Sequence, residues 1–381
     1  VSVDFTMSAV AGTPASIQAV SGESQTVTVN TQGAALKVVV KDNSGNNVSS
    51  PVPGCTVQFL VYRGTGSLNF TSRQTDASGE ASVVYTAGKT AGQEEVWASV
   101  EGKYSLAPAR FIINAVAGAA SKLSNASYYT AAYGRAGEAQ QLPFGVRVLD
   151  AFDNPVSGVK VDFAISTTAS TAGFPGQITL IEPSDSKSNY EGAVYCYIRH
   201  GNKSGTYEVS ASNIGLAGSP VRFEAVATSG ILNQQKTTFD PPAPNSAAAD
   251  GASTIEITLK CRDDYGNPVS GAYAYFYSDS GALSISQPQM PTDMYGVAKA
   301  TIKSGRSGTY KIKASVNSVN IIGEASVNFL SGPFSAAASQ YYLHQPPAKV
   351  LANNSDFYTV KAELRDEKGN PVQGVTPARL A

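Results

Sequence analysis

Residues 261–278, CRDDYGNPVSGAYAYFYS, hold a turn rich in Gly, Asn and Pro between two alternating apolar stretches. Related turns occur at 40–50 (VKDNSGNNVSS), 148–158 (VLDAFDNPVSG) and 364–374 (LRDEKGNPVQG). Their aspartates recur at intervals of 103 to 113 residues, at Asp42, Asp150, Asp263 and Asp366. A period of this length is the size of an independent domain, well above that of a solenoid repeat. The sequence therefore predicts a string of similar domains.

The stretches on either side of the turn predict strands. In a half-buried strand, residues two apart share a face. Before the turn this places Ile257, Leu259 and Cys261 on one face, and after it Ala272 and Phe276 share a face. The other copies show the same alternation, and no stretch has an apolar period of 3.6 residues over three turns. The predicted fold class is all-β, with tandem immunoglobulin-like β-sandwich domains in an elongated array.

A second landmark is a phenylalanine segment that we interpret as the last strand of each domain, at Phe5, Phe111, Phe223 and Phe329. The predicted divisions are 1–12 (the last strand of a preceding repeat), 13–118, 119–230 and 231–332 (repeats 1 to 3), and 333–381 (an incomplete repeat 4). The last segment has too little apolar surface to close a sandwich alone. Residues 227–251 are expected to form a longer, proline-stiffened linker before repeat 3.

Charge excludes several classes of partner. The chain has 28 basic and 29 acidic residues and a net charge of -1, which gives no electrostatic reason to bind nucleic acid or an anionic membrane. No apolar run has the length of a membrane span, and no signal peptide is visible. We expect this segment to contact neither nucleic acid nor membrane, and to be monomeric.

The third copy resembles the bacterial immunoglobulin-like (Big-1 type) repeats of the invasin and intimin family of surface adhesins. The shared pattern consists of Ala249-Asp250-Gly251, Asp263, Gly266-Asn267-Pro268-Val269, Thr292-Asp293, Gly296, Ala298 and Ser307-Gly308. The first copy departs from it at Asn47, where proline is expected, and the second at Asp153, where glycine is expected. The resemblance implies a non-enzymatic stalk on the bacterial cell surface, either anchored in the outer membrane or secreted, that projects a binding tip.

Catalysis and metal binding find little support in the residues. The two histidines are His200, expected as a solvated turn residue, and His344 in the incomplete copy, so no catalytic residue is predicted. Asp263, Asp264 and Asn267 cluster in one turn and could hold calcium, although such sites need six to eight oxygens. Capping of the turn by the aspartate side chain is the favoured alternative, and no other cofactor is expected.

The cysteines fall one to each complete repeat, at Cys55, Cys196 and Cys261, where other copies carry Val, Ala or Leu on the inward face. Bridges between separate domain cores are sterically excluded, because a disulfide needs Cα atoms within about 7 Å. We therefore predict buried free thiols that pack as small hydrophobic groups.

One surface feature points to recognition. With Ala272, Ala274 and Phe276 inward, the tyrosines between and after them, Tyr273, Tyr275 and Tyr277, point outward as a flat amphipathic stripe. Such a stripe suits a glycan, a host-cell protein or a bacterial surface protein. Cross-strand packing that only stabilises the sheet is the alternative. Trp97 is a second outward candidate.

Overall fold

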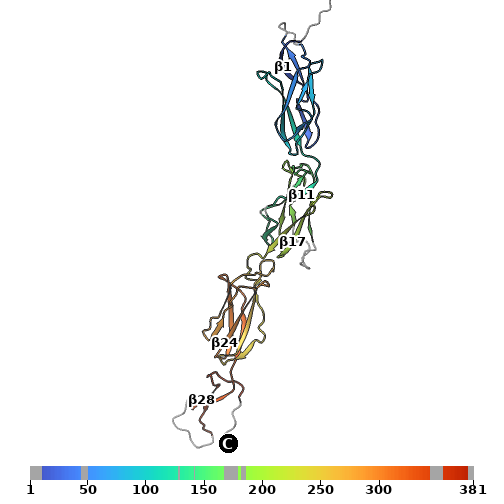
Figure 1. Cartoon of the computed structure of the whole chain (residues 1–381). Helices are drawn as coiled ribbons and strands as arrows, with labels where there is room; N and C mark the ends of the chain where they lie inside the picture. Colours follow the sequence, from blue (N-terminus) through green and yellow to red (C-terminus); the bar gives the residue numbers. More distant parts are fainter. Residues whose placement is uncertain are drawn as a thin grey trace, which may run out of the picture.

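The chain is a row of three β-sandwiches followed by a two-stranded ribbon (Figure 1). This computed structural model describes residues 11–43, 50–127, 129–140, 142–166, 179–181, 186–343 and 355–375. All regular structure in these residues is β-strand. No helix in the described part of the chain has the length and apolarity needed to cross a membrane.

The first sandwich packs the sheet β1-β3-β7 against the sheet β2-β10-β9-β4-β6, with a small pair β5-β8 at one side. Its strands are β1 (Pro14–Ser21), β2 (Ser24–Thr28), β3 (Leu36–Asp42), β4 (Thr56–Arg63), β5 (Ser67–Leu68), β6 (Ser72–Gln74), β7 (Glu80–Val83), β8 (Tyr85–Thr86), β9 (Gly92–Val100) and β10 (Ala109–Val116).

The second sandwich repeats this plan with the sheets β11-β13-β16-β15 and β12-β18-β17-β14. Its strands are β11 (Lys122–Asn125), β12 (Ala131–Arg135), β13 (Phe144–Leu149), β14 (Asp162–Ser166), β15 (Thr179–Ile181), β16 (Ala193–Arg199), β17 (Gly205–Ser212) and β18 (Val221–Thr228).

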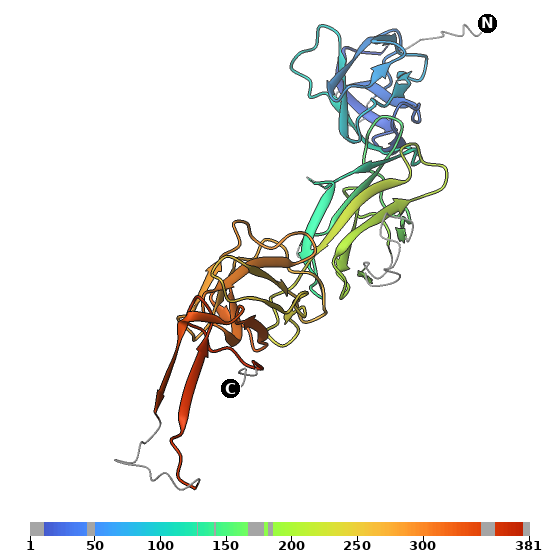
Figure 2. The same ribbon diagram turned by 90° about the horizontal axis from the view of Figure 1, so that it is seen from below.

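The third sandwich has the sheets β19-β21-β24-β23 and β20-β27-β25-β22, and β26 also pairs with β25. Its strands are β19 (Thr238–Phe239), β20 (Ser246–Ala248), β21 (Thr254–Lys260), β22 (Ala274–Tyr277), β23 (Leu283–Ser286), β24 (Val297–Ser304), β25 (Gly308–Val316), β26 (Val319–Asn320) and β27 (Ala325–Leu330). The fourth copy contributes β28 (Ser335–Leu343) and β29 (Val360–Arg365), which pair antiparallel (Figure 2).

The alternation predicted from the sequence is confirmed in the strands. In β21, Ile255, Ile257 and Leu259 are buried and lie opposite residues of β24 in antiparallel register. Their neighbours Glu256 and Thr258 face away from the core. Branched side chains suit such a pleated, half-buried surface. Their burial removes one face of the sheet from water, and the other face stays in contact with solvent.

Each sandwich has a separate hydrophobic core. Fully buried aromatic side chains stand at the centre of each core: Phe111 in the first, Phe144 and Phe223 in the second, Phe276 and Phe329 in the third. In the second core the rings of Phe144 and Phe223 stack at 4.7 Å between centroids. The core residues of one sandwich are not part of the core cluster of the next, so the apolar contribution to stability is divided by repeat.

Two features of the third repeat differ from the sequence-based expectation. Gly308 lies opposite Phe329 in β27, whereas the corresponding Gly92 and Gly205 lie opposite alanines. The alignment of Phe329 with Phe111 and Phe223 was therefore wrong by four residues, because Phe329 is the counterpart of Ala115 and Ala227. Residues 227–251 are also not a linker, because they contain β19 and β20 of the third sandwich.

The cysteines lie as predicted. None of the three forms a disulfide bond, Cys196 and Cys261 are fully buried, and Cys55 is partly buried. Burial raises the pKa of the Cys261 thiol to about 11, so the reactive thiolate is suppressed at neutral pH. The thiols thus act as small core side chains.

Candidate functional site

The recurring turn is built around a buried carboxylate. In the third repeat, Asp263 Oδ1 accepts hydrogen bonds from the backbone N–H groups of Tyr265 (2.9 Å) and Asn267 (2.8 Å). Its Oδ2 accepts from Gly230 N (2.7 Å) and Asn267 Nδ2 (2.8 Å). One side chain therefore closes its own turn and also holds the strand connection that enters the repeat.

The same network recurs around Asp150 and Asp366. The carboxylate of Asp150 accepts from Phe152 N, Asn154 N, Asn154 Nδ2 and Gly118 N at 2.8 to 3.2 Å. That of Asp366 accepts from Lys368 N, Asn370 N, Asn370 Nδ2 and Gly332 N at 2.7 to 2.9 Å. In the first repeat, Asp42 accepts from Gly12 N and Ser50 N. The network is a property of the repeat.

Hydrogen bonding outweighs the cost of burying these carboxylates. Asp150, Asp263 and Asp366 are at most 2% exposed. Burial alone would raise the pKa of each, but the asparagine side chain and the backbone N–H groups lower the pKa below its usual value. The aspartates are consequently charged in the folded protein, and four N–H dipoles replace the lost water around each of them.

At two of the turns the connecting glycine is favoured by this close approach. A Cβ atom at Gly230 would stand 3.3 Å from Asp263 Oδ2, and one at Gly12 would stand 3.0 Å from Asp42 Oδ2. A larger residue would push the carboxylate away from the N–H group that it binds. Glycine therefore lets the incoming chain lie directly on the turn.

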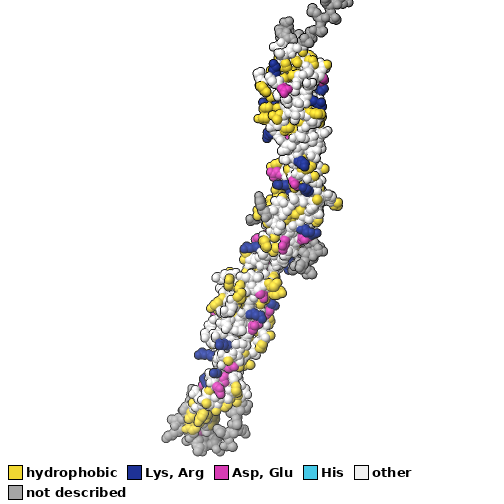
Figure 3. Space-filling model, in the orientation of Figure 1, with side chains coloured by type: hydrophobic (Ala, Val, Ile, Leu, Met, Phe, Trp, Pro, Cys, Tyr) yellow, Lys and Arg dark blue, Asp and Glu magenta, His cyan; other side chains and the backbone are white. Residues whose placement is uncertain are grey.

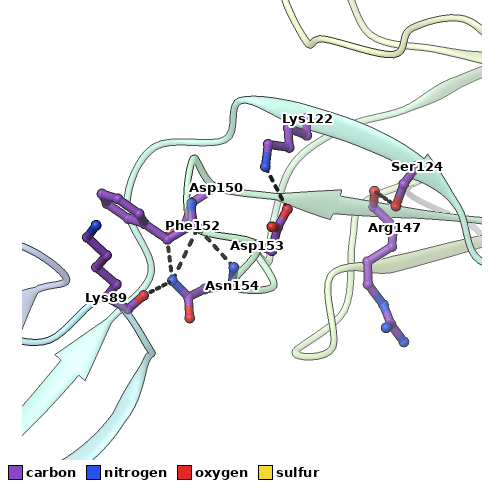
Figure 4. Close-up of polar contacts among 8 residues, drawn as sticks. All are labelled: Lys89, Lys122, Ser124, Arg147, Asp150, Phe152, Asp153 and Asn154. Carbon is purple, nitrogen blue, oxygen red and sulfur yellow. Dashed lines mark hydrogen bonds and ion pairs between the residues drawn. The ribbon is translucent and has the colours of Figure 1, made fainter. Parts of the chain in front are cut away.

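Four residues after Asp150, Asp263 and Asp366, an asparagine reaches across to the preceding repeat. Asn154 Oδ1 accepts from Ala91 N (2.7 Å), and its Nδ2 donates to Lys89 O (2.8 Å), as Figure 4 shows on the Lys89 side. Asn267 pairs in the same way with Ser204 N (3.0 Å) and Asn202 O (2.8 Å). Asn370 pairs with Ser307 N (2.9 Å) and Gly305 O (3.2 Å). Each side-chain amide thus binds one backbone N–H group and one backbone carbonyl oxygen of a single loop in the preceding repeat.

These contacts make three joints of one design. At each joint, which we call an Asp–Asn joint, the aspartate orients the asparagine through its Nδ2, and the asparagine binds the loop of the preceding repeat. The asparagines are buried, with Asn154 5%, Asn267 3% and Asn370 5% exposed. Since a buried amide hydrogen bond is shielded from competing water, the pair fixes both position and orientation of the two repeats.

Side contacts differ between the joints. At the first, the Lys89 ammonium lies 5.5 Å from the Phe152 ring centre, and Lys122 pairs with Asp153 at 2.7 Å (Figure 4). Asp153 adopts φ of 68°, the left-handed conformation that Gly266 and Gly369 take in the other turns. Aspartate tolerates this conformation better than most residues, which explains why the second copy can lack the glycine.

The calcium hypothesis stays a prediction. Both Asp263 oxygens and the Asn267 Oδ1 are engaged with N–H donors, and Asp264 Oδ1 accepts from Asn233 Nδ2 at 2.6 Å. The described residues contain no group of three His, Cys, Asp or Glu placed to hold a metal ion. A cation at this turn would have to displace hydrogen bonds that close the joint, so the contacts favour capping.

His200 is not the solvated turn residue expected from the sequence. Its side chain is 1% exposed, and neither ring nitrogen has a hydrogen-bond partner among the described residues. The ring lies over Gly134, where a Cβ atom would come within 2.4 Å of it. The expectation was wrong because the glycine on the facing strand leaves room for the ring, which sequence position alone did not reveal.

We expect the buried His200 to make repeat 2 sensitive to acid. Burial lowers the pKa of His200, and the nearby Glu138 only partly opposes this. The unfolded imidazole, with a pKa near about 6.5, therefore binds protons more readily than the folded one. The contribution of the neutral His200 ring to the stability of repeat 2 is present above that pH and is lost as the pH falls below it. Thermal melts of repeat 2 should show this loss, and a His200→Gln variant should lack it; identical pH profiles would contradict the prediction.

The tyrosine stripe faces solvent on the edge strand β22 and just before it. Tyr273 is 71% and Tyr275 57% exposed, while Tyr277 is half-buried. The rings of Tyr275 and Tyr277 stack at 6.4 Å, and Tyr277 pairs in register with Lys313. The outward orientation follows the alternation, and binding by the stripe stays a prediction.

Trp97 packs on the outer face of the first sandwich instead of standing free. The Tyr62 ring stacks on it at 3.7 Å, the Arg110 guanidinium lies 4.8 Å from its centre, and its Nε1 donates to Glu95 at 2.6 Å. A register shift between Val61 and Arg63 in β4 accompanies the Tyr62 position. The indole is thus partly covered by its neighbours and only partly exposed to a partner.

Charges are mixed over the visible surface of the array. Figure 3 shows basic and acidic side chains interspersed, with no large field of one sign on that face. Ion pairs of the third repeat include Lys299–Glu256 and Lys313–Asp279. Exposed pairs of this kind contribute little to stability.

Sequence reasoning missed the role of the asparagines. Asn154 and Asn370 were not singled out, and Asn267 was considered only as a metal ligand. The signal was present, because asparagine recurs four residues after the aspartate while the residues between them vary. The partners of the asparagine, which are backbone atoms of a differing loop, leave no such signal.

The comparisons with known proteins agree with this architecture. The family model of the bacterial Ig-like domain (group 1) matches residues 242–330. The third repeat is therefore similar to a bacterial Ig-like domain. The match lies on the third repeat, whose turn keeps both the glycine and the proline, whereas the first and second copies each lose one of them.

The chain also has relatives among adhesins. It is 27% identical over 354 residues to the inverse autotransporter adhesin YeeJ of Escherichia coli (strain K12), covering 92% of this chain and 14% of that protein. The Escherichia coli adhesin FdeC is similar in structure, with a TM-score of 0.54 and 21% identity, over 84% of this chain and 99% of that structure. Invasin, a bacterial integrin-binding protein, matches with a TM-score of 0.45 and 20% identity, over 80% of this chain and 58% of its own.

Proposed function

We propose that this chain is a stalk segment of a large bacterial surface or secreted adhesin, with a mechanical and non-enzymatic role. The observation that carries the proposal is the Asp–Asn joint, built three times from equivalent residues. A spacer gains from identical joints, because each added repeat then continues the same rod. The segment would hold a binding tip away from an anchor, outside the cell.

The joints give this role a physical basis. At each junction two hydrogen bonds of a buried asparagine cross between repeats, and the short connection is bound through its glycine N–H. Repeats with separate cores and no other contacts would be flexibly linked domains. With the joints closed, bending the array requires breaking buried hydrogen bonds, which leaves polar groups unsatisfied.

Removing the joint amides should loosen the rod without unfolding the repeats. In an Asn154→Ala, Asn267→Ala double variant, we expect small-angle X-ray scattering to show a smaller radius of gyration and a broader distribution of shapes. The melting temperatures should change little, since the asparagines lie outside the hydrophobic cores.

An Asn213→Ala variant is the matched control. Asn213 Nδ2 donates to Lys160 O within repeat 2, so the same truncation leaves both joints intact. Scattering curves of the double variant and the control that superimpose would refute the joint as the source of rigidity. A wild-type chain that scatters as a flexible string would refute the stalk.

A second function, recognition through the tyrosine stripe, is supported by the exposure of Tyr273 and Tyr275. Tyrosine offers a rigid, amphipathic surface that loses little conformational entropy on binding. Its partner would be a glycan, a host-cell protein or a structure on another bacterium. This role and the stalk role are compatible, because Tyr273 and Tyr275 are exposed on the sheet edge, whereas Asp263 and Asn267 are buried in the joint.

We expect a Tyr273→Ser, Tyr275→Ser, Tyr277→Ser variant to lose any binding of the chain to host cells, bacterial cells or immobilised glycans. A Tyr104→Ser variant is the control, since Tyr104 is 95% exposed on repeat 1. Equal binding by the triple variant and the wild type would assign recognition to another surface.

A further inference from the structure

Repeat 2 contains a cavity that the stalk role does not use. It has a volume of ≈ 410 Å³ and opens where the edge strand β12 faces the segment that follows it. A volume of this size is in the range of ligand sites. The residues that matter for its chemistry are Tyr129, Ala132, Tyr133, Glu138, Gln140 and Leu142.

Gln140 is a buried polar side chain in the wall of this cavity. It is 8% exposed, and neither its Oε1 nor its Nε2 makes a hydrogen bond of good geometry with the described residues, although the amide lies close enough to the Tyr129 hydroxyl to oppose the rise in pKa that burial causes in that group. Its backbone is held in place, because Gln140 N donates to Ile198 O at 2.8 Å. The hydroxyl of Tyr129 in the same wall donates to Pro143 O at 2.6 Å. A buried amide without partners is costly, so a ligand that satisfies it gains binding energy.

In repeat 1 the position that corresponds to this cavity is filled by a side chain, and we call this the closed arrangement. Gly33 is the counterpart of Gln140, since Gly33 N donates to Tyr85 O at 2.9 Å as Gln140 N does to Ile198 O. There Gln25, on the edge strand β2, fills the space, and a Cβ atom at Gly33 would come within 2.5 Å of its Oε1. In the parallel register of β12 with β18, the position of Gln25 is taken by Ala132. In repeat 2 the glutamine, Gln140, therefore stands on the opposite wall, and the space that Gln25 fills in repeat 1 is open.

The closed arrangement also shows which partner suits the glutamine. Gln25 Oε1 accepts from Ala34 N (2.7 Å) and its Nε2 donates to Ala34 O (3.2 Å), so the side-chain amide pairs with a backbone amide. Beside the cavity, β12 has a strand neighbour on one side only. Unpaired edges of this kind accept an additional extended strand.

We propose that repeat 2 binds an extended peptide segment along β12. The backbone amide of one peptide residue pairs with the Gln140 side chain, as Ala34 pairs with Gln25 in repeat 1. An apolar peptide side chain enters the cavity between Tyr129 and Leu142. Glu138 is the charged residue of the lining and is exposed, so it selects a lysine or arginine next to that side chain.

The test uses the whole chain with labelled alanine methyl groups and the peptide acetyl-Lys-Val-Thr-Val-Lys-amide. Ala131 and Ala139 line the cavity, and their NMR signals should shift in a saturable manner. A paired variant, Ala132→Gln with Gln140→Gly, recreates the closed arrangement of repeat 1. It should bind about tenfold more weakly or not at all, because the bidentate pair is lost. Gln25→Ala in repeat 1 is the control and should leave binding unchanged.

Three outcomes would overturn the proposal. One is the absence of any shift at millimolar peptide. Another is equal binding by the paired variant, or by the same peptide with N-methylated backbone amides, which cannot add as a strand. The third is saturable binding of N-acetylglucosamine or maltose without binding of the peptide, which would assign the cavity to a glycan.

Discussion

A Phe144→Ala variant should lose about 3 to 5 kcal/mol of stability in repeat 2 and almost none in its neighbours. Phe144 is fully buried and stacks on Phe223 at 4.7 Å. Truncation removes the apolar surface of the ring and leaves a cavity that the two rigid sheets cannot close. Because the three cores are separate clusters, the loss should stay within one repeat.

The chain offers an internal reporter for this experiment. Its single tryptophan, Trp97, lies in repeat 1, so fluorescence follows the unfolding of that repeat alone. Calorimetry of Phe144→Ala should show one transition lowered by more than about 10 °C, while the Trp97 transition stays in place. A Tyr190→Ala variant, which truncates an aromatic ring that is 83% exposed, should change neither. A Trp97 transition that falls together with the lowered one would show that the repeats unfold as a unit.

An Asp263→Ala variant should cost repeat 3 about 3 kcal/mol, since it leaves several buried N–H groups without an acceptor. The Gly230, Tyr265 and Asn267 donors at 2.7 to 2.9 Å all end on this carboxylate. Losing it also frees Asn267, so the joint to repeat 2 should loosen. Chemical denaturation measures the stability, and scattering measures the joint.

The neighbouring Asp264→Ala variant controls for charge. Asp264 is exposed, and its truncation should change the stability of repeat 3 by less than about 0.5 kcal/mol.

The effect of the Asp263→Ala substitution on stability should also depend on pH. Its pKa is lowered in the folded state, so its contribution is present above about pH 4 and is lost as the pH falls below that value. Wild type and Asp263→Ala should therefore converge in acid; a difference that persists there would refute the charge-based account.

Much of the fold could be predicted because it rests on local patterns. The two-residue alternation of Ile255, Ile257 and Leu259 specifies which face of β21 is buried, and a one-residue slip would expose all three. The turn residues separate these strands through their own backbone preferences. The inward position of Cys196 and Cys261 followed from the same alternation.

The errors arose where distant segments meet. His200 was expected in solvent, and it is buried because Gly134, far away in the sequence, leaves space for the ring. Residues 227–251 look like a linker from their prolines, and they become β19 and β20 because β21 and β27 offer them paired edges. Composition describes what a segment prefers alone, whereas pairing depends on the neighbour that it meets.

The amino-acid sequence by itself determined the repeat, its length, its β-strands and the burial of its cores, because these depend on periodicities within a few residues. Only the tertiary structure decided what the recurring turn is for. The Asp263 carboxylate and the Asn267 amide are four residues apart, but the loop that they hold, at Asn202 and Ser204, belongs to the preceding repeat and is bound through backbone atoms. Backbone donors and acceptors are the same in every residue, so the sequence of that loop does not show that the joint exists.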